Sequence, residues 1–183
     1  MKSNCLAVLL LAVPIVAQDD RVFKIDGTTI DGITVTSFDI RELKYTKNGS
    51  SMSLSSDQVV KVDLEQFDDV FRLGLRDADL MMTKAREQLA ENATLLAQLA
   101  LVRASAMFFD TGRPQEAVGA LEELKTAVPN AGVLPEIYRQ KFEFYMGQGR
   151  KSAKNAASVA RAYIAEAQGN EAQEEALDAQ ADA

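Results

Sequence analysis

The chain has 183 residues and a formal net charge of −7 at pH 7, and 47% of its residues are hydrophobic. This length fits one or two small domains, and the hydrophobic fraction is sufficient for a folded core. The sequence has no histidine and a single cysteine, Cys5. It therefore excludes catalytic triads that need histidine and zinc sites built from several histidines or cysteines.

An apolar run near the N-terminus predicts an export signal over residues 1–17. Lys2 precedes the run, which extends from Leu6 to Ala17, and the step from Ala17 to Gln18 fits a cleavage site. The run is too short to span a bilayer comfortably, and an uncleaved membrane anchor is the alternative interpretation. We therefore expect a periplasmic or secreted protein with no membrane span after cleavage.

Residues 21–65 alternate between apolar and polar side chains, which predicts five short strands. Three dipeptides between them are turn signals: Asp26-Gly27, Asp31-Gly32 and Asn48-Gly49. Asn-Gly in particular is typical of a two-residue hairpin. We expect a small, strongly bent antiparallel sheet that nearly closes on itself.

Three motifs in this region resemble a known class of fold. They are Asp-Gly-Ile-x-Val from Asp31, Leu-x-Tyr-x-Lys-Asn-Gly from Leu43, and Gln-Val-Val-Lys-Val from Gln58. Their order is similar to that of SH3-like and Sm-like small barrels, over about 45 residues. Sm-like proteins often bind RNA, but basic and acidic residues are balanced here. Because phosphate contacts need a basic excess, we expect no nucleic-acid partner.

From residue 77 the apolar period changes from two to about 3.6 residues, which predicts a helical domain over residues 77–168. The expected helices cover 77–90, 93–109, 114–127, 135–146 and 151–167. The junction at residues 65–69 has no proline or glycine, so it fits a rigid or a flexible connection. The acidic, alanine-rich tail at residues 169–183 is expected to be disordered.

Two apolar helical patterns meet at a tight turn in the segment Leu99–Pro129. The positions that define this pattern are Leu101, Ala104, Ser105, Phe108, Gly112, Ala117, Leu121 and Pro129. The spacing resembles one tetratricopeptide (TPR) unit, a helical hairpin that stacks on its neighbours. The resemblance implies a concave surface that binds another protein or a peptide.

A second and less regular unit follows. Phe142, Tyr145 and Gly149 take positions like those of Ser105, Phe108 and Gly112 in the first unit. Gly149 lies 37 residues after Gly112, against about 34 in the family, and Lys154 stands where the first unit has Ala117. On the first helix of each unit, the resemblance implies partner-binding roles for four residues: Arg103, Tyr138, Arg139 and Lys141.

The triplet Asp110-Thr111-Gly112 matches that of aspartic proteases, in which two chains can each contribute one carboxylate. Here the triplet follows a helical pattern, and Arg113 stands where those proteases have a small residue. We favour a turn between two helices in which Gly112 relieves strain at positive φ.

These observations predict an α+β protein, with a five-stranded barrel-like domain at residues 21–65 before the TPR-like helices. The expected function is non-catalytic binding of a protein or peptide by a scaffold or assembly factor of the cell envelope. We expect no cofactor and no metal site. One alternative is a structural subunit of a homo-oligomer or envelope complex, held by strand edges. Another is a dimeric aspartic protease that uses Asp110.

Overall fold

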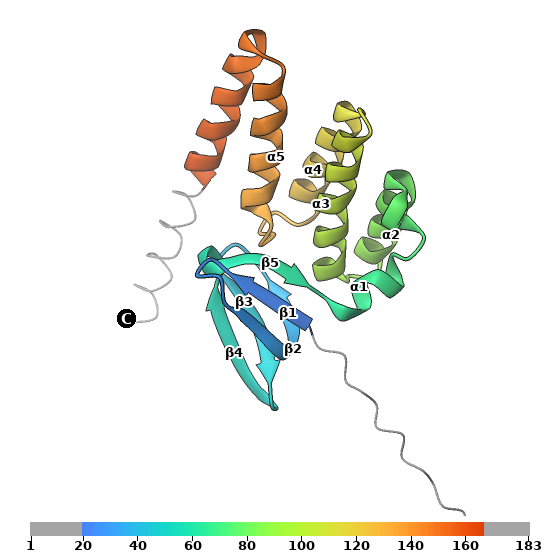
Figure 1. Ribbon diagram of the computed structural model, residues 1–183, viewed down its shortest axis with the longest axis vertical. Helices are drawn as coiled ribbons and strands as arrows, with labels where there is room; N and C mark the ends of the chain where they lie inside the picture. Colours follow the sequence, from blue (N-terminus) through green and yellow to red (C-terminus); the bar gives the residue numbers. More distant parts are fainter. Residues whose placement is uncertain (1–19, 167–183) are drawn as a thin grey trace, which may run out of the picture.

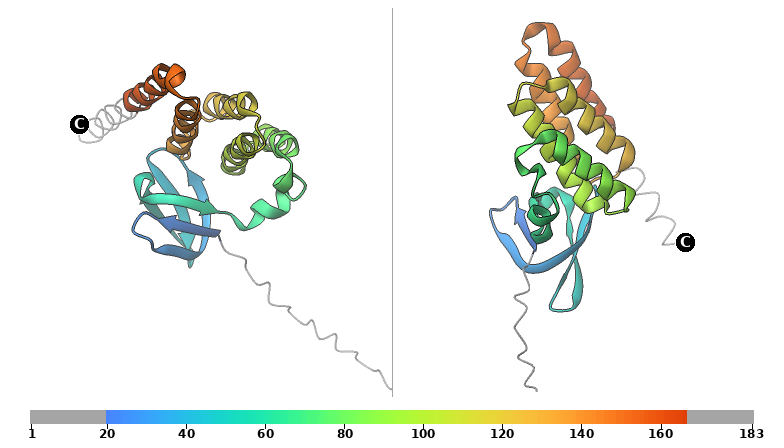
Figure 2. Two further views of the ribbon diagram at one scale, coloured as in Figure 1. Left: turned by 45° about the horizontal axis from the view of Figure 1, so that its top comes forward. Right: turned by 90° about the vertical axis from the view of Figure 1, so that its right-hand side faces the viewer.

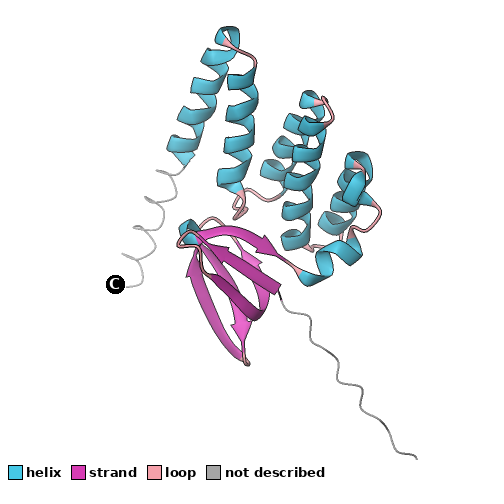
Figure 3. Ribbon diagram, in the orientation of Figure 1, coloured by secondary structure: helices cyan, strands magenta, loops and turns pink. Residues whose placement is uncertain are grey.

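The computed structural model describes residues 20–166, in which a five-stranded antiparallel sheet is followed by a series of helices (Figures 1 and 3). The α+β class predicted from the sequence is therefore confirmed. The predicted export signal at residues 1–17 and the tail at residues 169–183 lie outside the described residues.

The sheet contains the five strands that the alternating pattern predicts. They are β1 (Asp20–Lys24), β2 (Thr29–Phe38), β3 (Glu42–Lys47), β4 (Ser50–Ser55) and β5 (Val59–Asp63), in the order β4-β3-β2-β1-β5. Strands β4 and β5 are the two edges, and in the described part of the chain they do not pair with each other. The sheet is therefore open, and the closure suggested by the sequence is not seen.

Glycine plays different parts at two of the predicted turns. Asn48 and Gly49 form the β3–β4 hairpin, with φ angles of 52° and 77°, as a type I′ turn requires. The prediction of a turn at Asp31-Gly32 is wrong, because these residues lie inside β2. There two residues of β2 oppose a single residue of β1, so Gly32, at φ 71°, forms part of a β-bulge.

The helices fall close to the predicted ranges. They are α2 (Ala78–Ala90), α3 (Thr94–Asp110), α4 (Pro114–Ala127) and α5 (Leu134–Gly147), and a last helix covers residues 153–166 after a 3-10 turn at Arg150–Ser152. Figure 2 shows them as an arc that leaves the sheet at one end and returns to it at α5. Buried alanines such as Ala97, Ala100 and Ala104 on α3 let its neighbours approach closely.

The junction between sheet and helices is itself a short helix, α1 (Glu65–Val70), which the sequence did not predict. Phe67 and Phe71 anchor it, since both rings are buried and their centroids lie 4.6 Å apart. The carboxylate of Asp20 accepts from the backbone N–H of Glu65 (3.0 Å) and of Val35 (2.7 Å). This side chain satisfies a free donor at the first turn of α1 and ties that turn to β2.

A second contact joins the α4–α5 loop to the end of β2. The N–H of Gly132 donates to the carbonyl of Phe38 (3.3 Å), and the N–H of Ile40 donates to the carbonyl of Asn130 (3.1 Å). The buried side chain of Gln98, on α3, also donates to the Phe38 carbonyl (3.0 Å). These bonds hold the sheet at a fixed distance from α3 and α5 on this side.

Candidate functional site

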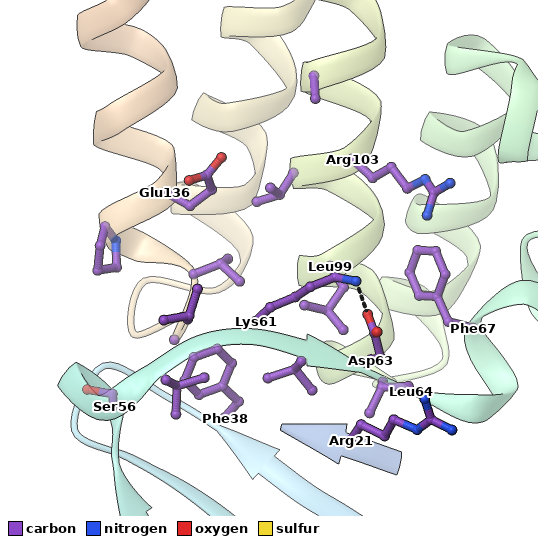
Figure 4. Close-up of a pocket in the computed structure, with 18 of the residues that line it drawn as sticks. Arg21, Phe38, Ser56, Lys61, Asp63, Leu64, Phe67, Leu99, Arg103 and Glu136 are labelled. Atoms are coloured by element: carbon purple, nitrogen blue, oxygen red, sulfur yellow. Dashed lines mark ion pairs between the residues drawn. The ribbon is translucent and has the colours of Figure 1, made fainter. Parts of the chain in front are cut away.

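A large cleft lies between the edge strand β5 and the helices α3 and α5 (Figure 4). We call it the β5 cleft, and it is lined by all of Val59–Asp63, by residues of α1, and by the facing sides of α3 and α5. Its volume is about 1410 Å³. The cleft exists because the loop that docks on β2 separates the helices from the sheet, and no side chain of residues 20–166 fills the space beyond it.

The walls of the β5 cleft combine apolar and charged side chains, and the apolar ones come from all three elements. Leu99 and Val102 come from α3, Val133 and Pro135 from the start of α5, and Val60 from the sheet. The Val60 side chain is 66% exposed, although valine is usually buried. Val60 also has no partner residue on β1, because the pairing steps from Lys61 directly to Val59. An exposed valine at a bulge in the cleft wall is therefore available to a bound molecule.

Two of the four predicted binding residues line this cleft. Arg103 extends from α3 over the Phe67 ring, with its guanidinium carbon 5.9 Å from the ring centroid (Figure 4). Among residues 20–166, no carboxylate lies within 4.0 Å of the Arg103 side-chain nitrogens. Its charge is therefore not committed to an ion pair inside the described structure.

Arg139 lies on the α5 wall and is already paired. Its guanidinium donates to Glu136, one turn earlier on α5, and to Glu143 one turn later. The bonds to Glu136 are the main cause of the raised pKa of Arg139. Partial burial acts to raise the pKa of Glu136, but donation from Arg139 and Gln140 outweighs it, so this pKa lies below its usual range. Both groups are therefore charged at neutral pH.

The other two predicted residues point away from the cleft. Tyr138 is only 5% exposed, and its hydroxyl is hydrogen-bonded to Lys125 on α4 and to Glu166 on the last helix. Lys141 pairs with Glu122 on α4. Successive residues on a helix differ by about 100° in direction, so Arg139 faces the cleft while its neighbour Tyr138 packs between helices. The structure thus brings Arg103 and Arg139 to one cleft and leaves Tyr138 and Lys141 outside it.

Asp110 lies at the exposed C-terminal end of α3. It lines a smaller cavity of about 350 Å³ that shares part of the α3 and α5 walls with the β5 cleft. The Thr111 hydroxyl donates to the carbonyl of Met107 (2.8 Å), and Gly112 has φ 73°. The triplet is therefore the helix-ending turn between α3 and α4, as the turn interpretation predicts.

Sequence reasoning missed the strand side of the cleft. The alternating pattern identifies β5 as a strand, but nothing in it says that the free edge of this strand faces two helices. Gln140 was missed too: it is buried beside the cleft, and its amide oxygen has no hydrogen-bond partner among the described residues. A polar residue in the apolar stripe of α5 was the only available signal.

No known protein-family model matches this chain, and no curated protein and no solved structure matches it either. Within residues 20–166 we find no helix with the length and apolar character needed to cross a bilayer. Among the same residues, we find no group of three or more Asp, Glu, His or Cys side chains that could hold a metal ion.

Proposed function

We propose that the protein is a non-catalytic binding module that holds a peptide, or a segment of another protein, in the β5 cleft. The cleft itself carries this proposal. Its volume of about 1410 Å³ exceeds the roughly 300–1,000 Å³ of typical small-molecule sites. A lining that combines apolar side chains with charged ones such as Arg103 suits a polypeptide occupant, which supplies both apolar and charged side chains.

The helical part of this proposal is a TPR-like array in which α3 and α5 are the first helices of two hairpins. Gly112 and Gly149 follow these helices with φ angles of 73° and 79°, so each of the two proposed hairpins has a glycine at positive φ in the turn between its helices. Both α3 and α5 turn one face toward the cleft. This is the place that the TPR resemblance gives to a partner, with the open, small-barrel-like sheet forming the opposite wall.

We place the protein in the cell envelope, as a scaffold or assembly factor that is periplasmic or secreted. The support for this is the export signal expected at residues 1–17 together with the net charge of −7, which does not favour a nucleic-acid partner. In that setting the cleft would hold a segment of an envelope protein.

A photo-crosslinking residue placed at Val102 in the full chain, in its native cells, tests the proposal. Val102 lines the cleft, whereas the control position Thr126 is exposed on α4 and does not. We expect a reproducible cross-linked partner from position 102 and none from position 126. The same partner from both positions, or none from either, would contradict binding in the cleft.

The alternative of a self-assembling structural subunit is favoured by a different observation. The outer edge of β4 is unpaired in the described structure, and Met52 on this strand is 47% exposed. Unprotected strand edges are templates for pairing between chains. A molecular mass that rises with protein concentration would favour this alternative, while a constant monomer mass would favour the binding module.

A further inference from the structure

The backbone of β5 forms strand-pairing hydrogen bonds along one of its two edges only. On its inner side β5 pairs with β1 through residues 61–63 and again at Val59. On its outer side, no hydrogen bond joins the backbone of Val60–Asp63 to any other element within residues 20–166, whereas the N–H of Val59 donates to the carbonyl of Ser56 in the preceding 3-10 turn. The outer edge therefore presents a short row of backbone donors and acceptors toward the cleft.

We infer that the occupant of the β5 cleft is an extended polypeptide segment that pairs with this outer edge as a sixth strand. The inference rests on the proposed function and names its binding mode. Because N–H and C=O groups alternate along a strand edge, the ligand that matches them is another polypeptide backbone in extended conformation. A helical or compact ligand would leave the row unpaired.

The geometry limits where pairing takes place. The bulge at Val60 interrupts the edge near the start of β5, and bulges disrupt the regular ladder. Regular pairing is therefore confined to Lys61–Asp63, a length of about 10 Å at the rise of a strand. Beyond the bulge, the exposed Val60 side chain adds an apolar contact instead of backbone bonds.

The opposite wall determines which side chains the segment carries. In an added strand, alternate side chains point to opposite faces, so one set faces Leu99 and Val102 on α3 and Val133 at the start of α5. These three side chains are apolar and only partly buried. The segment therefore carries apolar residues at every second position over its central part, with polar residues between them.

The test uses peptides selected on the full-length protein from a displayed library of short random sequences. The strongest binder that cross-links to a photo-reactive residue at Val102 is synthesised in three forms. One form is unmodified, one is N-methylated at its even-numbered residues, and one at its odd-numbered residues. N-methylation removes the N–H donor, and only alternate N–H groups of an added strand face β5.

Strand addition predicts that one methylated form loses affinity by about fivefold or more, because it loses the one or two backbone hydrogen bonds that outward-facing carbonyls of residues 61–63 can accept. The other form should bind within about threefold of the unmodified peptide. Hydrogen exchange gives an independent readout. Among the amides of residues 61–63, those that do not bond to β1 should exchange more slowly once the unmodified peptide is bound.

Equal loss, or no loss, in both methylated forms would overturn strand addition while leaving the cleft as the binding site. Unchanged exchange at residues 61–63 in the saturated complex would overturn it as well. A library that yields no peptide able to cross-link at Val102 would overturn the proposed function, and this inference with it.

Discussion

The sheet faces the helices along two strands, and the two regions differ: β2 is in contact with the helical part, and β5 is separated from it. At the end of β2, the carbonyl of Phe38 accepts from both Gly132 and Gln98, and the loop before α5 lies directly against the strand. Along β5, by contrast, a cleft of about 1410 Å³ separates strand and helices. The β2 contact fixes the position of the sheet, and the β5 cleft leaves space between the sheet and the helices. A site held open in this way needs little reorganisation when a partner binds.

The β2 contact is most sensitive to Gly132. A Cβ atom added there would lie 2.3 Å from the Phe38 ring, which is too close for either group to accommodate without moving the loop. We expect Gly132→Ala to lower the free energy of unfolding by about 2–3 kcal/mol and to weaken peptide binding by displacing α5. Urea denaturation and peptide titration measure the two effects.

Gly119 provides the matched control, because it lies within α4 and no heavy atom stands within 4 Å of an added Cβ. Gly119→Ala should raise the free energy of unfolding by up to about 1 kcal/mol, the difference in helix propensity between the two residues. Equal destabilisation by the two substitutions would show that the β2 contact is not tightly packed.

Gln98→Leu probes the same contact by removing one hydrogen bond. The Phe38 carbonyl would keep only its bond from Gly132, so we expect unfolding to become easier by about 1–2 kcal/mol. The loss is moderate because the Gln98 amide oxygen, which has no partner among the described residues, is removed as well. An unchanged urea midpoint would mean that this amide does not hold the helices to the sheet.

The cluster of Lys125, Tyr138 and Glu166 lies outside the β2 contact and outside the β5 cleft. It should therefore affect stability without affecting binding. Burial opposes the shift, but hydrogen bonds from Lys125 and Tyr138 lower the pKa of Glu166 below its usual 4.5. A lowered folded-state pKa stabilises the protein above pH 4.5, and this stabilisation is lost as the pH falls further. Glu166→Gln should therefore reduce the loss of stability between pH 5 and pH 3.

Urea midpoints across this pH range, for the parent and the Gln variant, measure the effect. Peptide affinity at neutral pH should be the same in both proteins. A variant that loses stability on acidification as steeply as the parent would exclude Glu166 as a source of the pH dependence.

Arg103→Ala, in the wall of the β5 cleft, should have the smallest effect on the free energy of unfolding. Within residues 20–166 its guanidinium lies over the Phe67 ring and makes no ion pair, so the free energy of unfolding should change by no more than about 0.5 kcal/mol. Binding of the selected peptide should nevertheless weaken. A large loss of stability would mean that Arg103 is a structural residue, in the same way as Gln98.

The elements themselves could largely be predicted from the sequence, because alternation and helical periodicity are local signals. Asn48-Gly49 was predicted correctly as a hairpin, whereas Asp31-Gly32 was not. The same dipeptide chemistry supports positive φ in a turn and in a bulge, and only pairing with β1 decides between them. Helix α1 was missed because six residues are too few to establish a period, although Phe67 and Phe71 have helical spacing.

The site could be predicted only in part. The TPR resemblance pointed to α3 and α5, which both line the cleft, and Arg103 and Arg139 lie in its walls. It did not separate Arg139 from its neighbours Tyr138 and Lys141, because the choice of face depends on how α4 and the last helix pack. The other wall depends on the loop at residues 128–133 docking against β2, a long-range contact with no sequence pattern of its own.

The central claim is that the cleft beside β5, and not the rest of the sheet, binds the partner. Two exposed apolar residues allow a matched comparison: Val60, which lines the cleft, is 66% exposed, and Ile25, which does not, is 72% exposed. Titrating the selected peptide against Val60→Glu and Ile25→Glu tests the claim most directly. The account predicts that Val60→Glu abolishes binding and that Ile25→Glu binds as the parent does. Full affinity in Val60→Glu, or equal loss in both variants, would contradict it.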